Sequence, residues 1–218
     1  MVTDPKSGAE LLKASLDLAK PVVETGCQLI EALFGEPFKV AGGMLADQVY
    51  WLRWRNRIRI ANRAEALLGK HEIAAKVLPP GFLLPLLDAA GDVEDETLQE
   101  MWGRLLAASV KAERHQHPIF VDALKKLSSE DATLFEEIAR KSLERGGAVP
   151  TEVARPWSDA EARAIQRLRA VGLVDYNRPA GWILAFGATD AAWASELGRQ
   201  LYAALTAIDS LKLESGDA

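Results

Sequence analysis

The sequence predicts a mostly α-helical protein, with an N-terminal helical domain followed by a small winged-helix-like α/β module. Apolar residues recur at helical spacing through the first two-thirds of the 218 residues. The pattern changes after Gly146-Gly147, where a helix, two strand-like segments and a further helix follow one another. We therefore assign residues 1–127 to the helical domain, 128–206 to the winged-helix-like module and 207–218 to a flexible tail.

Two adjacent helices are predicted in the middle of the chain. The first begins at Pro80, is bent at Pro85 and ends at Gly91. The second spans Glu94–Lys111, where acidic residues open the helix at the positive end of its dipole. Its apolar residues form one stripe, which predicts packing against a core. That stripe comprises Leu98, Met101, Trp102, Leu105, Leu106 and Val110.

Further helices are predicted on both sides of this pair. Upstream, one helix is expected over Ala9–Phe34 and another from Phe38 towards Gly69. Downstream, a short helix follows His117-Pro118. Ser128 and Asp131 then form a capping-box signature, which predicts that a new helix begins there.

The predicted C-terminal module begins its second helix at a capping box formed by Ser158 and Glu161. Two strands are then predicted over Leu173–Tyr176 and Trp182–Phe186, joined by a turn that contains Pro and Gly. Residues Thr189–Leu205 return to a helical pattern. Two helices, a hairpin and a final helix are the outline of a winged-helix domain.

The composition favours a folded cytoplasmic protein. A hydrophobic content of 49% is enough to form a core, and the single Cys27 fits a reducing compartment because it excludes an internal disulfide. The first eight residues lack the pattern of a secretory signal. The longest charge-free run, Val77–Leu87, is far shorter than the roughly 20 apolar residues of a transmembrane helix. We therefore expect neither export nor an ordinary membrane span.

A cluster of arginines lies on the predicted helix that ends near Gly69, with no acidic residue between Asp47 and Glu65. Helical spacing arranges the arginines in two rows that border an apolar face with tryptophans. Such a helix suits an anionic membrane surface or a partner-binding site. In the alternative, the tryptophans belong to the core and the arginines pair with the acids of residues 92–100. The candidate residues are Trp51, Arg53, Trp54, Arg55, Arg57, Arg59 and Arg63.

A second candidate surface is the exposed face of the helix that follows Ser158. In a winged-helix domain this helix would meet nucleic acid. Acidic residues at its start reduce the positive charge of this face. The chain has a net charge of −5, and basic residues outnumber acidic ones only before residue 79. Nucleic-acid binding is therefore the less favoured alternative to a protein contact. The candidates are Arg163, Gln166, Arg167 and Arg169.

A third alternative is a metal-dependent hydrolase that uses His115 and His117. Two histidines with Glu113 or Asp122 nearby resemble a ligand set, but they do not form a metal-binding motif. The acids from Asp92 to Glu100 fit the start of a helix better than a set of nuclease carboxylates. We therefore predict no catalytic residues, metal or cofactor.

The order of motifs between residues 78 and 132 resembles the abortive-infection alpha family. The resemblance covers about residues 40–145 well, with the family core at about 40–127, and the remainder of the chain loosely. The matching pieces are Pro79-Pro80, Asp88-Ala89-Ala90, an acidic turn, Leu98-Gln99-Glu100-Met101-Trp102 with Leu105-Leu106-Ala107, and His117-Pro118 before Phe120-Val121.

This resemblance implies a cytoplasmic bacterial protein that limits phage propagation. Of the mechanisms left open, we favour an interaction with a protein partner or phage component, or a peripheral contact with the inner membrane, over catalysis. A winged-helix nucleic-acid-binding regulator and a hydrolase at His115 and His117 are the alternatives. The sequence does not indicate an oligomeric state.

Overall fold

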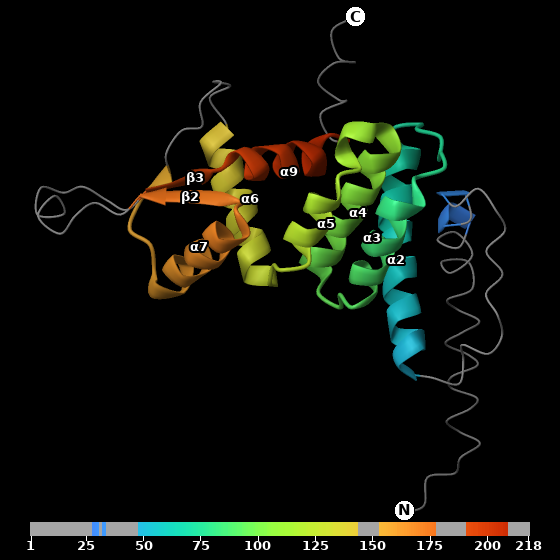
Figure 1. The fold of residues 1–218 in the computed structure, drawn as a ribbon, viewed down its shortest axis with the longest axis horizontal. Coiled ribbons are helices and arrows are strands. Elements are labelled where there is room, and N and C mark those ends of the chain that lie inside the picture. Colours follow the sequence, from blue (N-terminus) through green and yellow to red (C-terminus); the bar gives the residue numbers. More distant parts are fainter. Residues whose placement is uncertain (1–27, 31, 34–47, 144–152, 178–190, 209–218) are drawn as a thin grey trace, which may run out of the picture.

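The computed structural model describes residues 28–30, 32–33, 48–143, 153–177 and 191–208. Within these ranges the protein is mostly helical with a small antiparallel sheet, which confirms the predominantly helical class (Figure 1). The helices expected within residues 1–27 and 34–47 lie outside the described residues. The parts of the first helix that are described, 28–30 and 32–33, are helical.

Helices α2 (Gln48–Lys70), α3 (Pro80–Gly91) and α4 (Glu96–Lys111) form the helical part. Helix α3 begins at its proline and contains Pro85, as predicted. The Asp95 side chain caps α4, because its carboxylate accepts a hydrogen bond of 3.0 Å from the Leu98 N–H. Every member of the predicted apolar stripe of α4 except Leu98 is buried, and Leu98 is partly buried against the same core.

Helix α4 is followed by a short 3₁₀ turn (Glu113–His115), α5 (Pro118–Leu124) and α6 (Ser129–Leu143). The predicted capping box at the start of α6 is present. The Ser128 N–H donates to the Asp131 carboxylate, and the Asp131 N–H donates to the Ser128 hydroxyl, both at 3.2 Å.

The sheet contains β1 (Val153–Ala154), β2 (Val174–Asn177) and β3 (Ala191–Ala194) in the order β1-β3-β2, all antiparallel. Helix α7 (Asp159–Val171) precedes β2, and α9 (Glu196–Thr206) follows β3. The expected strand at 173–176 is confirmed within one residue. The strand expected at 182–186 lies outside the described residues.

The helix predicted from Thr189 was wrong at its start, because Ala191–Ala194 is a strand and the helix begins only at Glu196. Alanine favours helix locally, but this segment pairs with β1 on one side and β2 on the other. The sheet satisfies its backbone groups, so tertiary pairing overrides local propensity. Ser195 then caps α9 by accepting from the Gly198 N–H at 3.0 Å.

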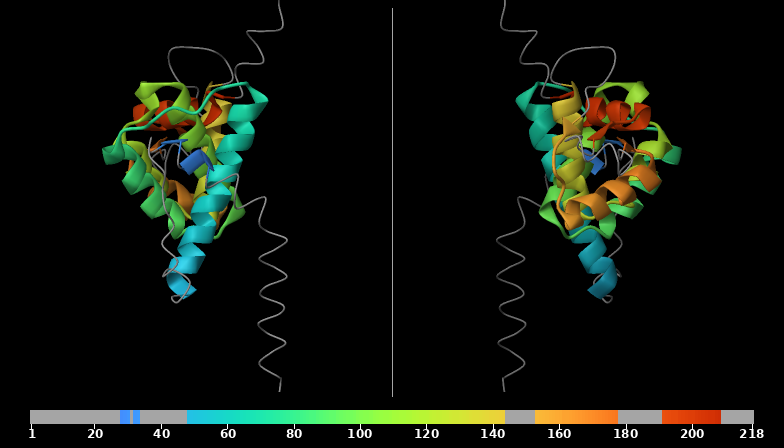
Figure 2. Two further views of the ribbon diagram at one scale, coloured as in Figure 1. Left: turned by 90° about the vertical axis from the view of Figure 1, so that its right-hand side faces the viewer. Right: turned by 90° about the vertical axis from the view of Figure 1, so that its left-hand side faces the viewer.

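The buried apolar side chains form one cluster that runs from Leu29 to Ile208. Helix α4 connects its two ends: Arg104 bonds Glu136 of α6 at 3.0 Å, and the Lys111 ammonium donates to the Ala207 carbonyl at 2.7 Å. The first turns of α2 project beyond the other helices (Figure 2). The division of the chain near residue 127 stays a prediction.

Candidate interaction surface on helix α2

Helix α2 buries one face against α3 and α4. The buried residues of this face, Asn56, Ile60, Ala61, Ala64 and Leu68, recur at helical spacing, and Ile58 is buried as well. Gly103 allows α4 to approach this face, because an added Cβ would lie 2.8 Å from the Cβ of Arg63. The helix therefore has a fixed rotation, which decides where each of the five arginines points.

Arg53 and Arg57 turn towards the end of α3. The guanidinium of Arg53 forms a bidentate contact with Asp92, with nitrogen–oxygen distances of 2.5 and 2.7 Å. This hydrogen bonding lowers the pKa of Asp92, against the opposing effect of burial. Arg57 donates to the Leu87 carbonyl at 2.8 Å and to the Asp88 carboxylate at 3.2 Å.

Arg63 bonds to α4. It donates to the Gln99 side-chain oxygen at 2.7 Å and lies 3.4 Å from the Glu100 carboxylate. Glu100 also pairs with Arg104 at 3.2 Å. Three arginines of the candidate cluster therefore hold α2 against its neighbours. For Arg53 and Arg63, this is the pairing with residues 92–100 that the scaffold alternative described.

Arg55 and Arg59 lie on the outward face of α2. Arg59 is exposed. Arg55 is partly buried, and its Nε is buried without a hydrogen-bond partner among the described residues. Neither arginine forms an ion pair with any residue that the structure describes. Helical spacing adds Leu52, whose residue surface is 38% exposed, to the same face. We call Leu52, Arg55 and Arg59 the outward face of α2. It is smaller than the seven-residue surface predicted from the sequence.

Trp54 does not join this outward face. It is partly buried and packs against the core, on the side of α2 away from Arg59, and Ile58 is buried. The side chain of Trp51 lies outside the described residues. In the described part of α2, the apolar side chains of Trp54 and Ile58 therefore face the core.

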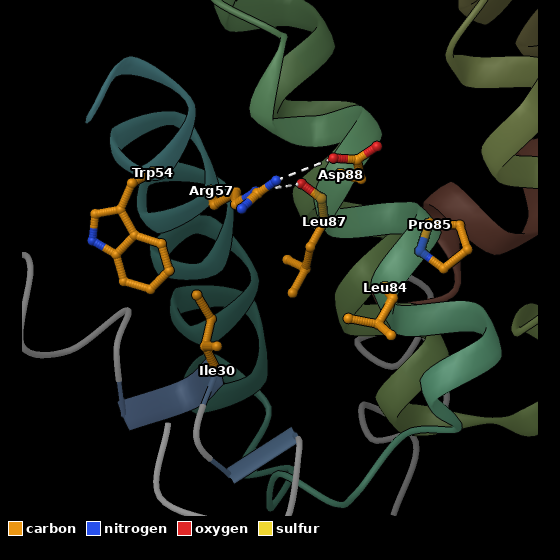
Figure 3. Close-up of a pocket in the computed structure, with 7 residues that line it drawn as sticks. All are labelled: Ile30, Trp54, Arg57, Leu84, Pro85, Leu87 and Asp88. Carbon is orange, nitrogen blue, oxygen red and sulfur yellow. Dashed lines mark hydrogen bonds and ion pairs between the residues drawn. The ribbon is translucent and has the colours of Figure 1, made fainter. Parts of the chain in front are cut away.

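Trp54 instead lines a hollow of about 560 Å³ between α2 and α3 (Figure 3). Its other lining residues are Ile30, Arg57, Leu84, Pro85, Leu87 and Asp88. Sequence reasoning did not select Leu84, Pro85 or Asp88 as site residues. Their spacing, which places all three on one face of α3, was the available signal.

On α7, Arg163, Gln166 and Arg169 are exposed, as their candidate role requires. Arg167 is engaged: it forms a bidentate contact with Asp131 of α6, at 2.7 Å for the shorter pair. The Asp131 side chain is only 2% exposed. Burial alone would raise the pKa of Asp131, but hydrogen bonds from Arg167 and Ser128 outweigh it and hold that pKa below its usual value.

The two candidate histidines have separate structural contacts. His115 is buried and its Nε2 accepts a hydrogen bond from Arg114 at 3.3 Å. Burial lowers the pKa of His115, and the charges of Arg114 and Lys111 lower it further. His117 caps α5, because its Nδ1 accepts from the Ile119 N–H at 3.2 Å. Among the described residues, no three His, Cys, Asp or Glu side chains are grouped to hold a metal ion.

A family model described as abortive infection alpha matches residues 55–182, from the third turn of α2 past β2. The chain belongs to the abortive infection alpha family. The match confirms the resemblance and includes residues beyond 145, where the resemblance was expected to be looser. Membership supports an abortive-infection-like role in defence. No curated protein and no solved structure matches the chain.

None of the described helices combines the length and the hydrophobicity that crossing a membrane requires.

Proposed function

We propose that this protein limits phage propagation from the bacterial cytoplasm by binding an acidic protein partner through the outward face of α2, without catalysing a reaction. The single observation behind this mechanism is the division of the arginines. Arg53, Arg57 and Arg63 hold α2 in place, whereas Arg55 and Arg59 keep their charge for an external group. The family supplies the defence context.

A protein partner fits the outward face better than a membrane surface does. A basic side chain near an anionic leaflet contributes about 1 kcal/mol. Two arginines would then contribute about 2 kcal/mol, with one partly exposed leucine to add apolar contact. Stable membrane attachment needs more than this. An acidic protein surface can hold carboxylates in fixed positions opposite both guanidinium groups, which makes two arginines count for more.

We also propose that residues 128–206 form a winged-helix-like module that contacts protein. The strand order β1-β3-β2 and the packing of α6 and α7 around the sheet support it. Because Arg167 already pairs with a buried carboxylate, the four candidate residues of α7 are not all available to contact nucleic acid. Arg163, Gln166 and Arg169 remain for contacts with a partner.

A phage challenge tests the proposal. Bacteria that express the protein at low level are infected with a diverse phage panel, and plaques and the survival of infected cells are recorded together. We expect fewer plaques with death of infected cells, and we expect the charge-reversed double variant R55E/R59E to lose this protection. Unchanged plaques with the unmodified protein would contradict the defence role.

The matched control is K125E/K126E, which makes the same charge change on two exposed lysines that follow α5. It should protect as well as the unmodified protein, at equal protein level and equal helicity by circular dichroism. Loss of protection in this control alone would contradict the assignment of the site to α2. Retention of the purified protein on anionic vesicles, abolished in R55A/R59A, would replace the protein partner with a membrane.

A further inference from the structure

The outward face of α3 is apolar where a helix facing water is normally polar. Gly81, Leu84, Pro85 and Asp88 recur at the spacing i, i+3, i+4 and i+7, and all four are exposed. Leu84 is 54% exposed. Only Asp88 is charged, and it stands at the end of the row. An apolar helix face of this kind gains free energy when a ligand covers it.

This face forms one wall of the hollow between α2 and α3. Figure 3 shows Trp54 and Ile30 on one side and Leu84 and Pro85 on the other, with Leu87 between them. The volume of about 560 Å³ lies within the range of sites for small organic ligands, which is about 300–1,000 Å³. The walls are aliphatic and aromatic, so the body of the ligand must be apolar.

The polar end of the hollow decides the charge of the ligand. Arg57 uses only two of its five N–H groups in hydrogen bonds, to the Leu87 carbonyl and to Asp88. Its side chain is 26% exposed, whereas that of Asp88 is 67% exposed. The Asp88 side chain is therefore much better hydrated than the Arg57 side chain. The poorly hydrated charge gains more from a new counter-charge, and Asp88 can return to water at little cost.

We propose that this hollow binds a dissolved single-chain amphiphile with an anionic headgroup. The apolar chain lies against Trp54, Leu84 and Leu87, and the headgroup takes the place of Asp88 on Arg57. This inference goes beyond the proposed function and uses none of the residues of the outward face of α2. Either can fail without the other.

The test uses the full-length protein and dodecanoate at neutral pH, kept below its critical micelle concentration, in isothermal titration calorimetry. We expect saturable binding to one site. Dodecyltrimethylammonium, which has the same chain and a cationic head, should bind about tenfold more weakly because it lacks the charge-assisted hydrogen bonds to Arg57. The absence of saturable dodecanoate binding, or equal binding of both amphiphiles, would overturn the proposal.

Three substitutions locate the ligand. L84Q should weaken dodecanoate binding about tenfold by removing apolar contact, and Leu84 is exposed enough for the fold to tolerate glutamine. R57Q should weaken it by a similar factor. D88N should strengthen it about threefold, because the competing carboxylate charge is gone. The D88N variant is compared at unchanged circular dichroism and with one ligand per protein, because a misfolded protein would bind several. Weaker or unchanged binding in D88N would contradict the proposed geometry.

R59Q is the matched control for R57Q, because it neutralises an exposed arginine of the same helix on another face. It should leave binding unchanged. Sedimentation with vesicles of phosphatidylcholine and phosphatidylglycerol separates a membrane lipid from a dissolved ligand. If vesicles retain the protein in an L84Q-sensitive manner and dissolved dodecanoate does not bind, the site recognises a membrane and the proposal is wrong.

Discussion

Helices α2 and α7 both carry arginines at helical spacing, but the acids that meet them differ in burial. On α2 the partners are partly or well exposed, with Asp92 at 54% and Asp88 at 67%. On α7 Arg167 meets Asp131, which is almost completely buried. Exposed pairs contribute about 0–1 kcal/mol, whereas an orphaned buried charge costs several. The same residue type is therefore expected to contribute little to stability on α2 and more at the α6–α7 contact.

The largest difference is expected between two glycines, one packed near each helix. Gly198 of α9 lies against Leu173, which follows α7, and an added Cβ would lie 2.0 Å from the Leu173 carbonyl oxygen, which is backbone and cannot give way. Gly103 of α4 lies against α2, and its added Cβ would lie 2.8 Å from the Arg63 Cβ. We expect Gly198→Ala to cost about 3 kcal/mol or more. Gly103→Ala should cost about 1 kcal/mol, because better helix propensity offsets part of the clash.

Urea unfolding of both variants measures these costs. If the two glycine substitutions lowered the free energy of unfolding equally, the close approach of α9 to Leu173 would be wrong. A Gly198→Ser variant should behave like Gly198→Ala, because both add the same Cβ.

The next effect concerns Arg167. Arg167→Ala should lower the free energy of unfolding by about 2–3 kcal/mol, because it leaves the buried Asp131 carboxylate without a cation. This expected loss of stability is smaller than is usual when a buried ion pair is broken, because the Arg167 side chain is about half exposed. The double variant R167M/D131N should recover most of the loss, because the asparagine keeps the cap of α6 and removes the charge.

The pH dependence provides a check that a mere packing defect would not reproduce. The folded pKa of Asp131 lies below its unfolded value of about 3.9, so the unmodified protein keeps this stability above that pH and loses it as the pH falls further. In Arg167→Ala, burial should raise the folded pKa above the unfolded one. That variant should then gain stability as the pH falls through the raised pKa. Parallel pH curves for the two proteins would contradict the role of Arg167.

The smallest effect is expected on α2. Arg53→Ala should cost no more than about 1 kcal/mol in spite of its bidentate contact, because both partners are exposed to solvent that screens them. Addition of 1 M salt should reduce the difference between the variant and the unmodified protein. A loss as large as that in Arg167→Ala would remove the contrast between the two helices.

The sequence predicted most of what depends on local signals. The start of α3 at Pro80, the stripe of α4 and the capping boxes at Ser128 and Ser158 all follow from neighbouring residues. Local signals failed at Ala191–Ala194, because a central strand is stabilised by partners distant in the sequence.

The candidate site was predicted less completely, for a similar reason. The arginine cluster was recognisable, but which arginines remain free depends on the rotation of α2 against α3 and on the position of Asp88 and Asp92. Helical spacing gives the relative directions of Arg53 and Arg59 but not which direction faces a neighbour. The hollow beside Trp54 depends on two helices together, so neither segment alone indicated it.

The strand order has a consequence for how the chain is made. β1 and β2 do not pair with each other, because β3 lies between them and bonds both. Among the described strands, β1 and β2 therefore have no partner until Ala194 has left the ribosome, and α9 can dock only after that. The helices of residues 48–143 can form before then, so the sheet is the later part of the described fold to be completed.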